Sequence, residues 1–330
     1  MKIMVIGGAG YIGSHAVKQL LEVGNQVVVI DNLETGHLES VPKAVPFYQV
    51  DIRNKDALKA VFEKEQVDGV IHFAANSLVG ESMTQPLKYY KNNVCGTETL
   101  LEVLVETSVK HIVFSSTAAT YGDVKEMPIK ETSLTTPTNT YGETKLAIEK
   151  MLKWTHKAHD LNYVCLRYFN VAGADVSGTI GEAHTTETHL IPLILQVPLN
   201  QRSHITVFGM DYETKDGTCI RDYIHVTDLV DAHLLALRYL MNGGESDVFN
   251  LGSNTGYSVL EMIEAARKVT GHSIPMQIGE RRAGDPALLI ASSDKAKNIL
   301  GWAPKFTDIE DIIASAWKWH QGHPNGYKGD

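Results

Sequence analysis

The first half of the chain alternates short apolar, β-branched runs with longer stretches in which apolar residues recur every three or four positions. The short runs are typical of buried parallel strands, and the periodic stretches are typical of amphipathic helices. Strands are predicted at 3–6, 27–30, 47–50, 67–74, 111–115 and 163–168, and helices at 12–23, 56–65, 89–107 and 141–159. This alternation predicts a Rossmann-like, doubly wound parallel sheet in an α/β fold, with helices on both faces.

The second half of the chain is less regular and carries short strands and helices between polar loops rich in Gly and Pro. Strands are predicted at 205–208 and 248–251, and helices at 227–241, 258–270 and 308–321. We expect a smaller mixed α/β unit that caps the carboxyl ends of the first sheet. The division expected from this change of pattern places residues 1–175 in the first unit and 176–330 in the second.

Composition narrows the classes of partner. Hydrophobic residues make up 43% of the 330 positions and charged residues 21%, which are globular proportions. The net charge is −9 and no basic block is present, so nucleic-acid and membrane partners are disfavoured. No signal or membrane segment is visible, which favours the cytoplasm. The widely spaced Cys95, Cys165 and Cys219 form neither a disulfide framework nor a metal motif, and no role is assigned to them.

A glycine-rich loop follows the first predicted strand and opens the first predicted helix. Gly7, Gly10 and Gly13 form a GxxGxxG pattern, in which the glycines allow a tight turn, a close approach to a pyrophosphate and close packing of helix on strand. The second strand ends at Asp31, whose carboxylate is suited to the adenosine ribose hydroxyls and would repel a 2′-phosphate. The sequence therefore predicts NAD as the cofactor.

A tyrosine and a lysine are spaced one helical turn apart at Tyr141 and Lys145. Thr140 and Glu143 fit a capping box, which predicts that a helix begins there. A lysine ammonium lowers the pKa of a nearby phenol, so this pair predicts a catalytic base. Thr117, at the end of the fifth predicted strand, is expected to hydrogen-bond the reacting oxygen. These residues indicate hydride transfer between a nicotinamide and a carbinol carbon, but they do not name the substrate.

Longer segments resemble the UDP-glucose 4-epimerase (UDP-galactose 4-epimerase) family of the extended short-chain dehydrogenase/reductase superfamily over essentially the whole chain. They are GGAGYIGSHAV, DNLETGH, DIRN, HFAANSLVGES, YYKNNVCGT, FSSTAATYGD, PTNTYGETK, RYFNVAGA, DGTCIRDYIHVTDL, FNLGS and RRAGDPA. The resemblance implies reversible C4 epimerisation of UDP-glucose and UDP-galactose in galactose metabolism, through a 4-keto sugar and tightly held NAD. It also implies a homodimer formed through the helices at 89–107 and 141–159, and a return of about 219–250 to the first unit.

The resemblance also implies individual contacts. Beyond the three glycines, the implied cofactor contacts are Tyr11, Ile12, Asp31, Asn32, Leu33, Thr35, Gly36, Asp51, Ile52, Phe73, Ala74, Ala75, Ser77, Asn92, Thr117, Tyr141, Lys145 and Phe169. The implied substrate contacts are Thr117, Tyr141, Asn170, His189, Leu190, Thr206, Val207, Phe208, Arg221, Arg282 and Asp285, with Leu289 beside the sugar. Guanidinium forks at Arg221 and Arg282 suit a pyrophosphate, and Phe208 suits uracil.

Three positions depart from the common family pattern or vary within it. The family often has Asn where this chain has His189, and Lys where it has Ser77. At the position of Leu289, a tyrosine goes with UDP-hexoses alone and a small residue goes with N-acetylhexosamines as well. Leucine is intermediate in size, so acceptance of the acetamido sugar stays open.

Several alternative functions are weighed against this interpretation. A UDP-N-acetylglucosamine 4-epimerase, or a dual-specificity enzyme, stays open because of Leu289. A nucleotide-sugar dehydratase is disfavoured because Ala118 and Ala119 stand where its acidic pair would be. An enzyme of UDP-hexuronates would need a cation for the C6 carboxylate, which the sequence does not identify. A catalytically silent NAD-binding regulator is disfavoured by the intact threonine, tyrosine and lysine.

The fourteen histidines form no HExxH motif. His184 and His189, like the pairs His156 with His159 and His225 with His233, are expected at the surface or in the core and not as metal ligands. The sequence therefore predicts no catalytic metal.

Overall fold

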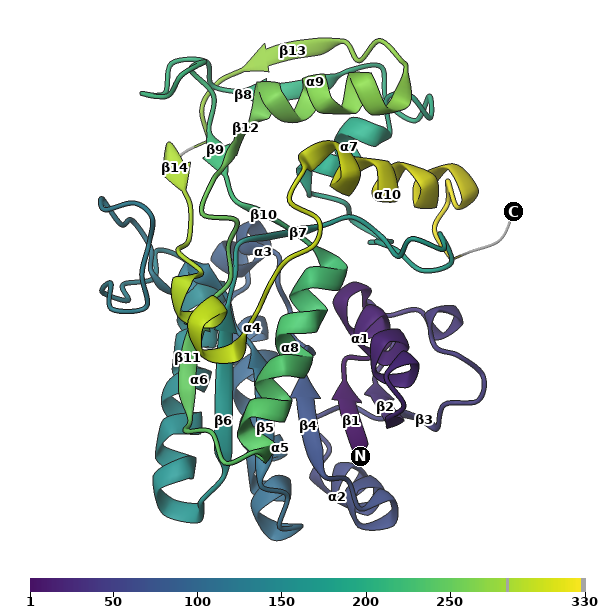
Figure 1. Ribbon diagram of the computed structural model, residues 1–330, viewed down its shortest axis with the longest axis vertical. Coiled ribbons are helices and arrows are strands. Elements are labelled where there is room, and N and C mark those ends of the chain that lie inside the picture. Colours follow the sequence, from purple (N-terminus) through teal and green to yellow (C-terminus); the bar gives the residue numbers. More distant parts are fainter. Residues whose placement is uncertain (283–284, 328–330) are drawn as a thin grey trace.

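A seven-stranded parallel sheet forms the main body of the computed structural model, which describes residues 1–282 and 285–327 (Figure 1). The third and fourth residues of the RRAGDPA segment and the last three residues of the chain lie outside the described ranges. The strand order is β11-β6-β5-β4-β1-β2-β3, and every neighbouring pair is parallel. The bounds are β1 Lys2–Ile6, β2 Gln26–Asp31, β3 Phe47–Gln49, β4 Gly69–His72, β5 His111–Ser115, β6 Asn162–Arg167 and β11 Asp247–Asn250. The predicted fold class is confirmed.

Helices cover both faces of this sheet because its central strands are apolar on both sides. In β1, Ile3 and Val5 pack into one core, and Met4 and Ile6 pack into the other. The first core is covered by α1 (Tyr11–Glu22) and α8 (Val226–Met241), and the second by α2 (Lys55–Glu65), α5 (Gly96–Glu106) and α6 (Thr140–His159). Continuous apolar runs in the sequence correspond to strands buried in this way.

A third core lies at the opposite end of the molecule, above the carboxyl ends of the strands (Figure 1). It is built from α7 (Leu190–Leu195), α9 (Val259–Thr270) and α10 (Ile309–Gly322), with β8 (Ile205–Phe208) paired to β13 (Met276–Gly279). A small three-stranded sheet has β9 (Ile220–Arg221) between β12 (Tyr257–Ser258) and β14 (Leu288–Leu289). Between the two ends, β7 (Asn170–Ala172) pairs with β10 (Tyr223–His225).

The chain crosses between these regions more than twice. After β10 it runs into α8 and then β11, which is the last strand of the seven-stranded sheet. It returns again at the helical turn η4 (Ala296–Leu300), where Leu300 and Trp302 pack against the core beneath α8. Indole Nε1 of Trp302 donates to the carbonyl of Asp228 at 2.8 Å. Late segments of the sequence therefore complete the first core.

Local structure departs from the predictions in two places. The helix predicted at 89–107 consists of α4 (Pro86–Tyr89), a π-helical segment η2 (Tyr90–Cys95) and α5, after a short α3 (Val79–Thr84). The predicted capping box is wrong: the N-cap of α6 is Asn139, whose side-chain oxygen accepts from the Gly142 amide at 2.9 Å. Two further short helical turns are η1 (Leu38–Ser40) and η3 (Ala118–Thr120).

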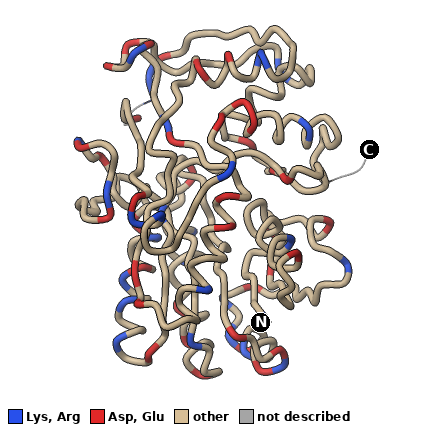
Figure 2. The backbone as a smooth tube through the Cα atoms, viewed as in Figure 1, with Lys and Arg blue, Asp and Glu red and all other residues tan. Residues whose placement is uncertain are grey.

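Acidic and basic positions are interspersed along the described chain, without a long basic segment (Figure 2). Across residues 1–282 and 285–327, no helix combines the length and the apolar character that a membrane crossing requires. Cys95, Cys165 and Cys219 are free thiols, and the last two are buried.

Candidate active site

The glycine loop is tightly packed between β4 and the first turn of α1. Gly7 has φ +80°, and a Cβ there would lie 2.6 Å from the Ala74 amide nitrogen. A Cβ on Gly13 would lie 2.0 Å from the carbonyl oxygen of Gly7. Gly10 is the N-cap of α1, and no side chain caps the backbone amides of the first turn of this helix. A loop of this shape, at a helix N-terminus with no acidic residue in its first turn, fits a pyrophosphate.

Asp31 joins the glycine loop to the end of β2. Its carboxylate accepts from the amides of Ala9 at 3.0 Å and Leu33 at 2.8 Å. Burial raises the pKa of Asp31. A Cβ on Gly36 would lie 2.9 Å from Oδ1 of Asp31, so the loop that follows β2 also lies close to this carboxylate. The structure thus brings the predicted Asp31–Gly36 segment onto the glycine loop.

Asp51 lies beyond β3, next to the same loop. The Arg53 guanidinium hydrogen-bonds to Asp51 and holds the pKa of that carboxyl well below its usual range. The side-chain amide of Asn32 donates to Asp51 at 3.1 Å, and the adjoining Ile52 is buried. Asn32 and Asp51, both predicted as cofactor contacts, are therefore neighbours.

Thr117, Tyr141 and Lys145 come together where β5 ends and α6 begins. Thr117 is the N-cap of η3, and its hydroxyl oxygen accepts from the Ala119 amide at 3.1 Å. The Thr117 side chain lies close enough to the Tyr141 phenol to lower its pKa, against the larger effect of burial. Nζ of Lys145 lies 5.9 Å from the centroid of the Tyr141 ring. The spacing predicted from the sequence is therefore realised in three dimensions.

The charge state of this trio differs from the one predicted from the spacing. Burial raises the pKa of Tyr141 to about 12, and burial lowers the pKa of Lys145 to about 7. Burial therefore outweighs any lowering of the tyrosine pKa by Lys145 in this structure. Nζ of Lys145 donates instead to the Ser115 carbonyl at 2.8 Å and lies 4.7 Å from the Phe114 ring centroid.

The sequence analysis missed a buried ion pair directly beneath Lys145. Glu149, one turn further along α6, pairs with Arg167 of β6, and its Oε1 accepts from the Ser116 hydroxyl at 2.6 Å. Both charged side chains are less than a tenth exposed. The continuation of the four-residue spacing from Tyr141 through Lys145 to Glu149 is the signal that could have found this carboxylate.

A second missed residue, Asn93, holds the loop that follows β4. Its side-chain oxygen accepts from the Asn76 amide at 2.8 Å, and its nitrogen donates to the Asn76 carbonyl at 3.0 Å and to the Thr144 hydroxyl at 3.1 Å. The predicted contact Asn92 donates to the same side-chain oxygen at 3.1 Å. This network fastens to α6 the segment that contains Phe73, Ala74, Ala75 and the exposed Ser77.

The predicted substrate contacts of the second half fall into two groups. Arg221 forms an ion pair with Asp285, and Leu289 of β14 lies in register beside Arg221 of β9. The Arg282 guanidinium lies 4.1 Å from the Phe208 ring centroid, at the end of β8. In that strand Val207 is buried and Thr206 is half-buried. Each of the two arginines thus lies against another predicted substrate contact.

Further predicted contacts lie where the first unit ends. Phe169 and Leu289 pack on the same small apolar cluster, which contains Ala118 and Tyr121. The Asn170 side chain donates to the Asp222 carbonyl at 3.1 Å. Tyr11 directs its hydroxyl to the Gly173 carbonyl at 2.6 Å.

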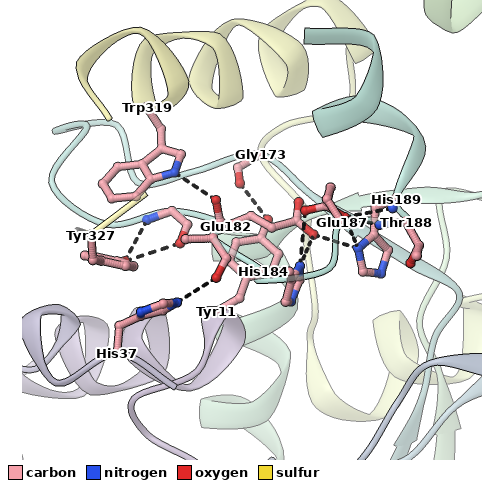
Figure 3. A network of polar contacts seen from close by, with 12 residues as sticks. Tyr11, His37, Gly173, Glu182, His184, Glu187, Thr188, His189, Trp319 and Tyr327 are labelled. Carbon is pink, nitrogen blue, oxygen red and sulfur yellow. Dashed lines mark hydrogen bonds and ion pairs between the residues drawn. The ribbon is translucent and has the colours of Figure 1, made fainter. Parts of the chain in front are cut away.

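His189 is the N-cap of α7, and Leu190 is the first residue of that helix. Nδ1 of His189 lies 2.9 Å from Glu182 and 2.8 Å from Glu187, so it faces two carboxylates (Figure 3). Although burial opposes the charge, these carboxylates raise the pKa of His189 to about 10. His184, which the sequence analysis set aside together with His189, lies against the same two carboxylates.

A doubly wound sheet with this glycine loop and this threonine, tyrosine and lysine defines an extended short-chain dehydrogenase/reductase. Residues 3–252 match the model of the NAD dependent epimerase/dehydratase family. A UDP-glucose 4-epimerase of Halalkalibacterium halodurans is 59% identical over 327 residues, which are 99% of this chain and 98% of that one. The chain therefore belongs to the NAD-dependent epimerase/dehydratase family and, within it, to the UDP-glucose 4-epimerases.

Solved structures are also similar. A crystal structure of a UDP-glucose 4-epimerase is 58% identical, with a TM-score of 0.98 and complete coverage of both chains. The Bifidobacterium longum UDP-glucose 4-epimerase, solved in complex with NAD+ and UDP, is 40% identical with a TM-score of 0.93, and the match covers 99% of this chain and 100% of that one. The protein is thus an NAD-dependent isomerase with a nucleotide-sugar substrate.

Proposed function

We propose that this chain interconverts UDP-glucose and UDP-galactose by inverting C4 of the hexose, with Thr117, Tyr141 and Lys145 as its catalytic residues. The observation that carries the proposal is the convergence of these three side chains where β5 ends, in a fold whose glycine loop fits NAD. Such a reaction belongs to galactose metabolism.

Tyr141 acts as the base in this mechanism. It removes the proton from the O4 hydroxyl while the Thr117 hydroxyl holds the same oxygen, and it later returns the proton on the opposite face of the sugar. Because burial raises the pKa of Tyr141 to about 12, turnover requires a nearby positive charge that lowers this pKa. Lys145, one helical turn away, supplies part of that charge in its protonated form.

The remaining residues hold the two nucleotides. The glycine loop binds the cofactor pyrophosphate, Asp31 binds the adenosine ribose, and Lys145 binds the nicotinamide ribose. NAD, when bound there, would supply the hydride acceptor that a transient 4-keto sugar requires. Arg221 and Arg282 bind the UDP pyrophosphate, so a 4-keto sugar anchored only through UDP is free to turn over. The net redox change is zero, and the protein therefore retains its NAD.

The test is incubation of the purified protein with UDP-glucose and NMR analysis of the C4 epimers. Tyr141→Phe is expected to abolish turnover while bound NAD remains, and the half-exposed Tyr90→Phe is the matched control. Full turnover by Tyr141→Phe would overturn the assignment of the base. An original protein that holds NAD but turns over no UDP-glucose would instead agree with a regulator that only binds NAD.

The substrate range is a separate question that Leu289 decides. This side chain is half-buried and packs on the cluster formed by Tyr121 and Ala118. We expect UDP-glucose to be used well, and UDP-N-acetylglucosamine to be used only as far as Leu289 leaves room for the acetamido group. Leu289→Tyr is expected to reduce turnover of the acetamido sugar selectively. An equal loss with both substrates would contradict this role.

We further propose a cytoplasmic homodimer built on α4, η2, α5 and α6. Leu87 in α4 is 80% exposed and Trp154 in α6 is 66% exposed, and contact with a second copy of the chain would cover these two apolar side chains. Free thiols at all three cysteines fit a reducing compartment. Light scattering that detects only a 36 kDa species would refute the dimer.

We also propose that the chain works as two interleaved units. The first comprises residues 1–175 together with about 219–250, and the second comprises the rest. The pairing of β11 with β6 and the packing of α8 on the sheet support this division.

A further inference from the structure

A compact cluster of imidazoles and carboxylates lies in the segment that joins β7 to α7. Within eight residues it contains Glu182, His184, Glu187 and His189, spaced as E-x-H-x-x-E-x-H. One ligand atom from each side chain lies within 4.8 Å of the other three. Figure 3 shows the two histidine rings directed at the same pair of carboxylates. The usual short metal motifs do not have this spacing, which is why the sequence analysis set it aside.

The distances between the histidine nitrogens and the carboxylate oxygens of the cluster are close to those between the ligands of a single metal ion. Nδ1 of His189 lies 2.9 and 2.8 Å from Glu182 and Glu187, and Nδ1 of His184 lies 3.2 and 3.3 Å from them. Zinc–ligand bonds of 2.0–2.1 Å place the ligands of a tetrahedral ion about 3.3 Å apart. The four nitrogen–oxygen distances lie within about 0.5 Å of this spacing, and Glu187 offers a different carboxylate oxygen to each histidine.

The backbone of the segment is fixed by neighbours from three other parts of the chain. Indole Nε1 of Trp319 donates to the Glu182 carbonyl at 2.9 Å. Nε2 of His37 lies 2.7 Å from the Ala183 carbonyl oxygen, and the Tyr327 hydroxyl lies 3.1 Å from the Gly181 amide. Glu187 accepts from the amides of the two residues that follow it, at 2.8 Å each. Ligands held in this way are preorganised for an ion.

The charge of the cluster also suits a divalent cation. The side chains of Glu182 and Glu187 are 6% and 10% exposed, and each is ion-paired only to the two histidines among the described residues. No lysine or arginine of residues 1–282 and 285–327 pairs with them. A divalent cation that displaces one proton from each imidazole would be bound by two neutral imidazoles and two carboxylates, so the net charge of the site would stay at zero. Buried carboxylates are stabilised by pairing of this kind.

We propose that Glu182, His184, Glu187 and His189 form a structural binding site for a divalent cation, with zinc the best fit. Imidazole and carboxylate ligands in a four-coordinate arrangement suit Zn²⁺, and a site filled by four protein ligands leaves no open position for catalysis. The site is thus compatible with the predicted absence of a catalytic metal. Its test does not depend on the function proposed above, although His189 is also an implied substrate contact.

The place of the site in the fold indicates what a bound ion would do. His189 is the N-cap of α7, and the ring of His184 lies edge-on to Tyr11, with 6.4 Å between the ring centroids. Tyr11 begins α1, directly after Gly10 of the glycine loop. A bound ion would therefore fasten the start of α7 beside the first turn of α1.

The test uses the tag-free, NAD-loaded protein, produced with added zinc and measured by elemental analysis. We expect one zinc per chain, removable by a chelator and restored by ZnCl₂ in calorimetry, with Tm about 5 °C higher in the reloaded protein. Co²⁺ in place of zinc should give the visible spectrum of a tetrahedral N/O site, without the charge-transfer band of a thiolate.

Two histidine variants test the ligand assignment. His184→Ala is expected to weaken zinc binding at least tenfold, and His159→Ala, at an exposed histidine near the end of α6, should bind like the original protein. Zinc binding that is equally tight in His184→Ala would overturn the proposal. If His184→Ala does not fold, the original protein still decides: a chelated and reloaded sample that binds less than half an equivalent of Zn²⁺ or Co²⁺ would also overturn it.

Discussion

Nζ of Lys145 donates a hydrogen bond to the backbone carbonyl of Ser115 at 2.8 Å, which ties the first turns of α6 to the last residue of β5. Both elements contribute to the candidate active site, because Tyr141 lies one turn before Lys145 and Thr117 lies two residues after Ser115. One buried ammonium therefore holds the base and its partner hydroxyl in register.

Lys145→Met should remove this bond and the positive charge together. We expect kcat to fall by about 10²–10⁴-fold, which is the usual range for loss of acid–base assistance. A coupled assay for UDP-glucose measures this, with the exposed Lys150→Met on the same helix as the control. Near-normal kcat in Lys145→Met would show that the lysine has no part in the chemistry.

Glu149→Gln should destabilise the protein by breaking the buried pair with Arg167. The remaining guanidinium would be left without its carboxylate, and loss of one partner of a buried pair costs about 3–5 kcal/mol. Urea unfolding measures the change. Glu310→Gln, which breaks a pair with Lys268 at the surface, should cost no more than about 1 kcal/mol. Equal effects of the two variants would contradict the importance given to burial.

Gly13→Ala should disturb the glycine loop directly. The added Cβ would overlap the carbonyl oxygen of Gly7, so α1 must shift away from the loop. We expect loss of most of the bound NAD and a destabilisation of about 1–3 kcal/mol. The NAD released on denaturation gives the occupancy. Gly322→Ala in α10, where a Cβ meets nothing within 4 Å, is the control and should retain the cofactor.

Acid should destabilise the fold through buried neutral histidines. Burial lowers the pKa of His15, His72, His225 and His233 to about 4, 3, 3 and 4. The unfolded chain takes up protons below its own histidine pKa of about 6.5, and the folded chain does not until near pH 4. The contribution of these histidines to the free energy of unfolding is therefore fully present above about pH 6.5. It falls as the pH drops, by about 2 kcal/mol per histidine at pH 5.

One of these histidines offers a direct check. Nδ1 of His233 contacts the Leu229 carbonyl at 2.9 Å, and Nε2 contacts the Ser115 hydroxyl at 3.2 Å. A carbonyl only accepts, so Nδ1 donates its proton and Nε2 accepts from Ser115. Between about pH 7 and pH 5, the free energy of unfolding of His233→Gln should therefore fall by about 2 kcal/mol less than that of the original protein. An unchanged pH dependence of urea unfolding would contradict this assignment.

Much of the first unit could be predicted from the sequence because its strands are buried on both faces and its helices are long and periodic. The π-helical segment at Tyr90–Cys95 was missed because it leaves the apolar pattern of the helix intact. Strands of two or three residues, such as β9 and β10, are too short to show any period. The N-cap was placed on Thr140 and not on Asn139, since both residue types are good caps and only geometry separates them.

The candidate site was predictable where neighbours in sequence are also neighbours in space. The four-residue spacing of Tyr141 and Lys145 indicates that they lie on one face of a helix, and the spacing of the three glycines indicates a nucleotide-binding loop. The pairing of Glu149 with Arg167, and of Arg221 with Asp285, joins distant segments, so no local pattern reports it. The pKa of Tyr141 likewise depends on burial, which the spacing does not reveal.

The return of the chain to its first core has a consequence for how the protein is made. The sheet lacks its last strand until β11 has been synthesised, and α8 lacks part of its cover until Trp302 has followed. A nascent chain therefore has to leave the ribosome almost entirely before the nucleotide-binding core is complete. A gene fragment that ends with the family match at residue 252 would encode a core that lacks Leu300 and Trp302.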